Sequence, residues 1–196
     1  MKNAFRLAAT ASALFLCSTT LQAADDKNPL RLDIKTTVQI GTCKAELQNP
    51  GGSRITSIAF GNVYKSELAN KLKVQNFQLA FTNCVGLVKK QAKMTLEPTV
   101  PAGCAGPSAN SANFANSVTG GSAASSVEVW MEQPDSGTAL HCFNKPEQTI
   151  NLSTATGATA KIVPFSARMA IAPGRTLADV TAGAFSTKAT FVITYE

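Results

Sequence analysis

Cysteine is the reactive residue type whose number and spacing are most informative in this chain of 196 residues. Apart from Cys17 near the N-terminus, the chain contains four cysteines, which are Cys43, Cys84, Cys104 and Cys142. None of them has the C-x-x-C spacing of a zinc or redox site. An even number of cysteines in an exported protein indicates disulfides formed in an oxidising compartment. Four cysteines allow three pairings, and the spacing alone does not choose among them.

Catalytic residue types are sparse. A Ser/His/Asp or Cys/His site would have to use His141, the single histidine. His141 precedes Cys142, and a histidine next to a cysteine that is expected to form a disulfide is usually a loop residue. Glycoside chemistry needs two acids in one cleft, but Glu128 and Glu132 share the polar face of one predicted strand, where we expect exposure to solvent. The chain has no Gly-rich phosphate loop and no metal-ligand spacing. We therefore predict no enzyme, no catalytic residues, no metal and no cofactor.

The first 23 residues have the features of an export signal. Lys2 and Arg6 form a short positive region, and residues 8–19 supply an apolar stretch that is too short to span a bilayer. Leu21-Gln22-Ala23 offers a small residue at the cleavage point, so we expect the mature chain to begin at the next residue. Lipid attachment at Cys17 is disfavoured, because the residue before it is a bulky leucine.

The mature chain is only mildly basic. Sixteen basic and twelve acidic residues remain once Lys2 and Arg6 are removed, which leaves a net charge of +4. The one basic cluster, Lys89, Lys90 and Lys93, is typical of the solvated face of a strand. Nucleic-acid binding normally needs a basic stripe with interleaved aromatic residues, so we do not predict it. The remaining length fits a single domain.

Alternation of apolar and polar residues, the period of a half-buried strand, dominates the mature chain. The alternating runs lie at 30–40, 77–84, 92–96, 127–132, 163–171 and 185–195, with shorter strands expected at 55–60 and 149–152. Gly, Pro, Asn and Ser separate the runs, and no segment shows a sustained helical period. Seven or eight short strands predict a β-sandwich of immunoglobulin type. Residues 102–126, rich in Ala, Ser, Gly and Asn, are expected to form a long surface excursion.

The two ends of the mature chain allow two interpretations. The run at 30–40 has one apolar face over eleven residues, and such a strand needs a partner to cover that face. The last strand, in turn, stops with no room for another strand after it. Periodicity alone is equally compatible with both ends being ordinary strands of one closed sandwich.

Several motifs, taken in order, resemble the pilins of chaperone–usher fibres, the type 1 fimbrial subunit family. Gly41-Thr42-Cys43 follows the amphipathic arm, and Phe81-Thr82-Asn83-Cys84 comes about forty residues later. Residues 162–168, with the sequence IVPFSAR, are similar to a late-strand motif of the family. Gly183 is fourteenth from the C-terminus, an alternating run follows it, and Tyr195 is penultimate. The resemblance covers essentially the whole mature chain.

The resemblance implies an all-β fold: an incomplete immunoglobulin-like β-sandwich that lacks its C-terminal strand and is completed by a donor strand from another chain. Residues 1–23 would be the signal peptide, residues 24–37 the N-terminal donor-strand extension and residues 38–196 the pilin domain. In the family, a sheet-spanning disulfide joins the cysteines that correspond to Cys43 and Cys84. The other two cysteines, Cys104 and Cys142, would then be an additional pair.

The resemblance also implies site residues. The donor strand would place four residues in the groove of a neighbour: Leu30, Leu32, Ile34 and Thr36. Thr36 occupies a position at which the family's arms usually carry a glycine, which leaves the register of the donor strand open. The acceptor groove, which would also contact the chaperone, would be formed by Gly183, Phe185, Ala189, Phe191, Ile193 and Tyr195.

The function implied is that of a structural subunit of a fimbria, or pilus, which polymerises by donor-strand exchange and supports cell adhesion. Expected partners are other pilin subunits, a periplasmic pilus chaperone, an outer-membrane usher and a host receptor. The chain would pass through the periplasm to the cell surface. Whether it is a major, minor, adaptor or terminator subunit stays open.

Three alternatives belong to other classes. A single-domain adhesive or adaptor pilin would bind a host receptor directly, with residues 102–126 as its candidate surface. A two-domain tip adhesin or a two-domain pilus chaperone would need a longer chain than this one. A secreted hydrolase would depend on His141.

Overall fold

The structure, a computed structural model, describes residues 41–99, 103–106 and 112–196. Within them it contains nine strands, one short α-helix and one 3-10 turn. Their bounds are β1 Thr42–Gln48, α1 Lys65–Ala69, β2 Val74–Val85, β3 Gln91–Pro98, β4 Phe114–Ala115, β5 Ser125–Met131, β6 Thr138–Ala139, β7 Gln148–Asn151, β8 Lys161–Ile171, η1 Leu177–Asp179 and β9 Ala189–Tyr195. The predicted run at 30–40 and the donor-strand extension lie outside the described residues.

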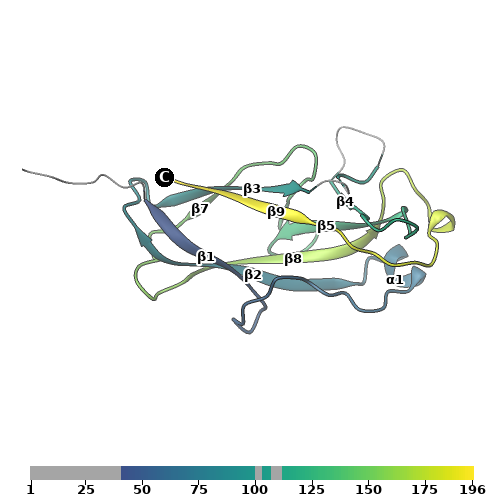
Figure 1. The fold of residues 1–196 in the computed structure, drawn as a ribbon, viewed down its shortest axis with the longest axis horizontal. Helices are drawn as coiled ribbons and strands as arrows, with labels where there is room; N and C mark the ends of the chain where they lie inside the picture. Colours follow the sequence, from purple (N-terminus) through teal and green to yellow (C-terminus); the bar gives the residue numbers. More distant parts are fainter. Residues whose placement is uncertain (1–40, 100–102, 107–111) are drawn as a thin grey trace, which may run out of the picture. The chain divides into compact units, whose positions relative to one another are not determined.

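The strands form two antiparallel sheets that pack face to face (Figure 1). The larger sheet has the order β1-β2-β8-β5-β4, with β6 also paired to β5, and the smaller sheet has the order β7-β3-β9. Four of the predicted interior runs and the short strand near residue 150 correspond to β2, β3, β5, β8 and β7. The prediction of an all-β, incomplete immunoglobulin-like sandwich is confirmed.

Alternation along each strand decides which residues form the core. In β8, Val163, Phe165, Ala167 and Met169 are buried at every second position, as their spacing predicts. Aromatic rings link the two sheets, because Phe165 of the larger sheet stacks on Phe77 at 5.4 Å between centroids and contacts Phe191 of the smaller sheet at 5.3 Å. Burying such rings is worth roughly 1.5–3 kcal/mol each, so this cluster holds the layers together.

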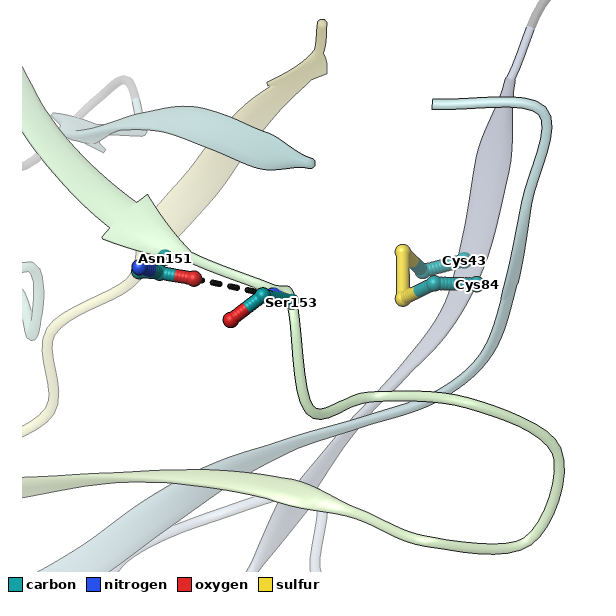
Figure 2. Close-up of a disulfide and its surroundings, with 4 residues drawn as sticks. All are labelled: Cys43, Cys84, Asn151 and Ser153. Carbon is teal, nitrogen blue, oxygen red and sulfur yellow. Dashed lines mark hydrogen bonds between the residues drawn. A yellow bond between two sulfur atoms is a disulfide. The ribbon is translucent and has the colours of Figure 1, made fainter. Parts of the chain in front are cut away.

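The disulfide between Cys43 and Cys84 joins β1 to β2 (Figure 2). These are neighbouring strands of the same sheet, so the expectation of a sheet-spanning bond was wrong. The sulfur atoms face the turn after β7, where the backbone N–H of Ser153 donates to Oδ1 of Asn151 at 2.9 Å. The end of β2 reaches the same turn through the backbone, since the N–H of Cys84 donates to the carbonyl of Ala155 at 3.1 Å. The bond therefore fixes the first strand at the edge of the larger sheet.

Two expected strand segments are not strands. Residues 55–60 have no ladder partner: the N–H of Ile55 still bonds to the carbonyl of Leu47 at 2.9 Å, but beyond it the chain leaves the sheet. Residues 185–188 likewise precede β9 and do not belong to it. Their backbone bonds elsewhere, since the N–H of Ser117 donates to the carbonyl of Ser186 at 2.7 Å. Apolar residues of both segments pack against the core, but the neighbouring strand is missing.

The expectation of a surface excursion at 102–126 was also wrong for most of the described part of this segment. β4 extends the larger sheet by pairing with β5, and Phe114 is buried in the core. Buried Asn113 donates through Nδ2 to Oγ of Ser126 at 2.9 Å. The disulfide between Cys104 and Cys142 then fixes this segment to the chain that follows β6. Packing of this kind leaves less free surface for the adhesive role considered above.

The helix α1 connects β1 to β2 at one end of the sandwich. Glu67 accepts a hydrogen bond from the backbone N–H of Tyr64 at 2.8 Å, which satisfies one N–H at the start of the helix. Leu68 is its buried residue and anchors the helix to the core. No helix among the described residues is long and apolar enough to span a membrane.

Candidate functional site

The edge of β9 that faces away from β3 is open. Among the described strands, β9 pairs with β3 alone. The N–H of Glu196 donates to the carbonyl of Gln91 at 2.9 Å, and the carbonyl of Lys188 accepts from the N–H of Thr99 at 3.0 Å. Because hydrogen bonding alternates along an antiparallel strand, the even-numbered residues point their backbone groups at β3. The backbone groups of the odd-numbered residues, from Ala189 to Tyr195, therefore face the open edge.

The other side of this opening is formed by the end of the larger sheet. β1 is the edge strand there, and the unpaired chain that follows it, residues 56–65, runs towards α1. Two sheet edges thus lie on the same side of the sandwich with no described strand between them. Edges of this kind are the usual templates for adding a strand from another chain.

Between these edges lies a groove with a volume of about 1390 Å³. One wall is formed by residues 56–65 and the other by residues 180–191. Its floor consists of apolar core residues from both sheets and from α1, which are Leu68, Phe77, Leu96, Val127, Val129, Ala167 and Met169. The groove therefore opens directly onto the hydrophobic core, and an apolar segment that filled it would complete that core.

Four of the six predicted acceptor residues line the groove: Gly183, Phe185, Ala189 and Phe191. The remaining two, Ile193 and Tyr195, lie further along the same face of β9 and pack partly buried against the core. Burial raises the pKa of the Tyr195 phenol above its ordinary value. The predicted donor residues Leu30, Leu32, Ile34 and Thr36 lie outside the described residues.

Sequence reasoning missed the residues that hold the second wall in place. Asn116 donates through Nδ2 to the carbonyl of Ala184 at 2.9 Å and accepts at Oδ1 from the N–H of Ser186 at 3.0 Å. Gly121 lies so close to this segment that a Cβ there would stand 2.2 Å from the Ala184 carbonyl oxygen. These contacts replace the strand pairing that residues 185–188 lack. A single Asn in a polar loop gives no sequence signal for such a contact.

The far end of β9 is fixed by charge. The Glu196 carboxylate accepts from Nε2 of Gln91 at 2.7 Å and from Nζ of Lys89 at 3.2 Å. These two bonds hold the pKa of Glu196 below its ordinary value. Lys93 also lies 3.6 Å from this carboxylate. The basic cluster is largely exposed, as expected, and part of it secures the C-terminal residue to the β3 side of the sheet.

The remaining candidate residues do not converge. Glu128 was expected to be exposed, but its side chain is largely buried, because it pairs with Arg168 on the outer face of the larger sheet. Glu132, in contrast, is exposed. His141 lies half-buried beside the disulfide formed by Cys104 and Cys142. In the described part of the chain, no three His, Cys, Asp or Glu residues gather in a way that could hold a metal ion.

An antiparallel sandwich with an apolar groove along the open edge of one strand defines an incomplete immunoglobulin-like domain. The chain belongs to the fimbrial protein family, whose model matches residues 32–196. Members of this family are structural subunits that polymerise into pili with other subunits, and they are not enzymes. The chain is thus a surface fimbrial protein.

The chain is also similar to individual proteins. The chain is 40% identical over 188 residues to the uncharacterized fimbrial-like protein YadL of Escherichia coli (strain K12), covering 93% of this chain and 91% of YadL. Among solved structures, it is similar to the P pilus rod subunit PapA, with 23% identity, a TM-score of 0.48 and coverage of 72% of this chain and 93% of PapA. It is also similar to the CupB6 tip adhesin from Pseudomonas aeruginosa, with 15% identity, a TM-score of 0.46 and coverage of 63% and 31% respectively.

Proposed function

We propose that this chain is a structural subunit of a chaperone–usher fimbria that polymerises by donor-strand exchange and supports cell adhesion. The observation that carries the proposal is the groove along the open edge of β9. It offers unpaired backbone groups on one side and an apolar floor beneath. An incoming strand could satisfy both, with its backbone pairing to β9 and every second side chain entering the groove.

The N-terminal extension, residues 24–37, has the pattern that this groove requires. Leu30, Leu32 and Ile34 alternate with polar residues, so one face of an extended strand would be apolar. Burial of each side chain would contribute about 1.5–3 kcal/mol, and each main-chain hydrogen bond about 0.5–1.5 kcal/mol. Ordering the arm offsets part of this gain. The remaining gain favours a long-lived joint between subunits.

The same groove accounts for the partners we propose. An uncovered apolar floor would drive aggregation in the periplasm, so a pilus chaperone would cover it until the subunit reaches an outer-membrane usher. There the extension of the next subunit would replace the chaperone. A host receptor would be bound by the assembled fibre, outside the groove.

Deleting residues 24–37 tests the proposal. The shortened chain keeps its groove, so it should be recovered with its chaperone but should not join a fibre as donor. Electron microscopy of surface fibres gives the readout. The matched pair Leu32→Asp and Lys35→Asp refines it, since only the first change affects the apolar face of the extension. Normal fibres from the deletion, or equal loss from both substitutions, would contradict donor-strand exchange.

A further inference from the structure

Exposed apolar side chains gather at the two opposite ends of the sandwich. Of the eight large apolar residues that are exposed in the described part of the chain, three belong to α1, η1 and their flanks: Tyr64 is 70% exposed, Leu72 68% and Leu177 40%. We call these three residues the helix-end patch. Two others, Val85 at 63% and Val88 at 91%, lie in the β2–β3 hairpin. We call them the hairpin patch.

The two patches differ in their relation to the groove. The helix-end patch adjoins the groove at the start of β9, because α1 lies against η1 and the groove lining includes both Tyr64 and Lys188. The hairpin patch lies at the end of β9, where the N–H of Lys89 bonds to the carbonyl of Glu196 at 3.1 Å. Figure 1 shows α1 and the C-terminus on opposite sides of the domain.

The donor extension leaves its own domain at the hairpin patch. Gly41, where the described chain begins, lies against Gly86 so closely that a Cβ on Gly41 would stand 2.4 Å from the Gly86 carbonyl oxygen. Five Cα–Cα steps separate Thr36, the last predicted donor residue, from Gly41. They span at most roughly 17 Å. A domain whose extension fills a neighbour's groove must therefore hold its hairpin close to one end of that groove.

The direction of the donor strand decides which end this is. A donor parallel to β9 would place the hairpin beside the neighbour's own hairpin. An antiparallel donor places it instead at the helix-end patch. The antiparallel arrangement is favoured, because β9 pairs antiparallel with β3 and β3 with β7, and antiparallel ladders are slightly more stable per residue than parallel ones.

We propose, resting on the donor-strand function above, that successive copies of this chain also touch through their folded domains. Val85 and Val88 of one copy pack against Tyr64, Leu72 and Leu177 of the next. The contact joins two different surfaces, so it repeats without closing and suits a fibre. It adds a second connection between neighbouring domains beside the donor strand.

Cross-linking of assembled fibres tests the contact. A chain carrying Val88→Cys and Leu72→Cys is assembled and treated with a short bismaleimide, and the products are separated after denaturation. We expect a ladder of covalent multimers. The control carries Val88→Cys and Phe143→Cys, since Phe143 is 51% exposed but belongs to neither patch. Fibres that form normally but give no more multimers than this control overturn the proposal. If the first pair does not assemble, Val88→Cys with Tyr64→Cys provides the same readout.

Fibre stiffness gives a second and independent measurement. Val88→Glu should still assemble, because the groove and the extension are untouched, but its fibres should bend more, with a persistence length at least halved in electron micrographs. Phe143→Glu should leave the persistence length unchanged, and an unchanged value for Val88→Glu contradicts the domain contact. A result against the donor-strand proposal is distinguishable from these outcomes, because it consists of normal fibres from the chain that lacks residues 24–37.

Discussion

Asn116 Nδ2 donates a hydrogen bond to the carbonyl of Ala184 at 2.9 Å, although the two residues are 68 positions apart. The same side chain accepts from the N–H of Ser186 and, at 3.1 Å, from the N–H of Val118. One amide thus connects the β4–β5 loop to the chain that leads into β9. The groove has a defined second wall because of this connection.

Asn116→Ala should loosen that wall. Four hydrogen bonds are lost, two donated to the carbonyls of Ala184 and Ser122 and two accepted from backbone N–H groups. Each is worth about 0.5–1.5 kcal/mol, so we expect a loss of about 2–3 kcal/mol in the free energy of unfolding. The measurement is urea denaturation of the mature chain bound to a peptide of residues 25–37. Asn116→Asp keeps both acceptor bonds but loses both bonds donated by Nδ2, so its stability should lie between those of the unsubstituted chain and Asn116→Ala. A loss from Asn116→Asp as large as that from Asn116→Ala would show that only the two bonds donated by Nδ2 matter.

Two proline substitutions at the start of β9 should distinguish the role of its open edge from that of the edge paired with β3. Ala189 and Thr190 are both exposed, but the N–H of Ala189 faces the groove whereas that of Thr190 faces β3. Ala189→Pro removes a donor needed by an incoming strand, so peptide binding should weaken by about tenfold while β9 stays paired. Thr190→Pro breaks the ladder to β3 and should lower stability by about 3 kcal/mol. Binding by titration and urea denaturation distinguish them, and equal effects on binding would contradict the assigned edge.

The sequence was sufficient to predict most of the longer strands that pair with another strand of the same chain. β8 is an example, because its alternating apolar residues Val163, Phe165 and Ala167 are all buried, although the residues between them from Phe165 onward are buried as well. The strand predictions failed at residues 55–60 and 185–188, where apolar residues pack against the core but no strand lies alongside. A period reports which side chains can share a face, whereas pairing depends on which segment lies next to the strand.

Side-chain contacts between segments that are distant in the chain could not be predicted from the sequence either. Glu128 stands at a polar position of β5, and only the fold shows that Arg168 of β8 lies opposite it. Residues 102–126 read as loop because they are small and polar, yet Phe114 enters the core. The four acceptor residues that line the groove were accessible only through the family resemblance, since nothing in their types indicates an open edge.

Removing each disulfide should affect the groove differently. In the chain-entropy model, loops of 41 and 38 residues contribute nearly the same stability, about 4 kcal/mol each. Replacing Cys43 and Cys84 by Ala frees β1, which is the sheet edge beside the groove, so peptide affinity should fall together with stability. Replacing Cys104 and Cys142 should lower stability while leaving peptide affinity within about twofold. Equal losses of affinity would show that the β1 edge has no special role.

Arg168 joins β8 to β5 and to the turn that follows it. Its guanidinium donates to Glu128 through Nε at 2.9 Å and through Nη2 at 2.5 Å, and it also binds Asp135. The indole of Trp130 lies 5.7 Å from its central carbon. Arg168→Met leaves Asp135 without its partner and leaves the largely buried Glu128 with only the longer contact to Lys71 at 3.5 Å. We expect a cost of about 3 kcal/mol, the low end for breaking a buried pair. Arg168→Met with Glu128→Leu should recover part of this loss in urea denaturation. A double variant no more stable than the single one would mean that the pair is not the cause.

The same cluster makes stability depend on acid. The hydrogen bond from Arg168 holds the pKa of Asp135 below its ordinary value. A carboxyl whose pKa is lower in the folded than in the unfolded chain stabilises the fold above the unfolded value, about 3.9, and loses this effect as pH falls through the folded value. Asp135→Asn should therefore be less stable than the unsubstituted chain at neutral pH, and the difference should shrink below about pH 4. Glu132→Gln, an exposed acid on the same turn, is the control and should show no such convergence. Urea midpoints measured across pH test this, and a difference for Asp135→Asn that stays constant from neutral pH down to about pH 2.5 would show that the bond to Arg168 does not set the acid sensitivity.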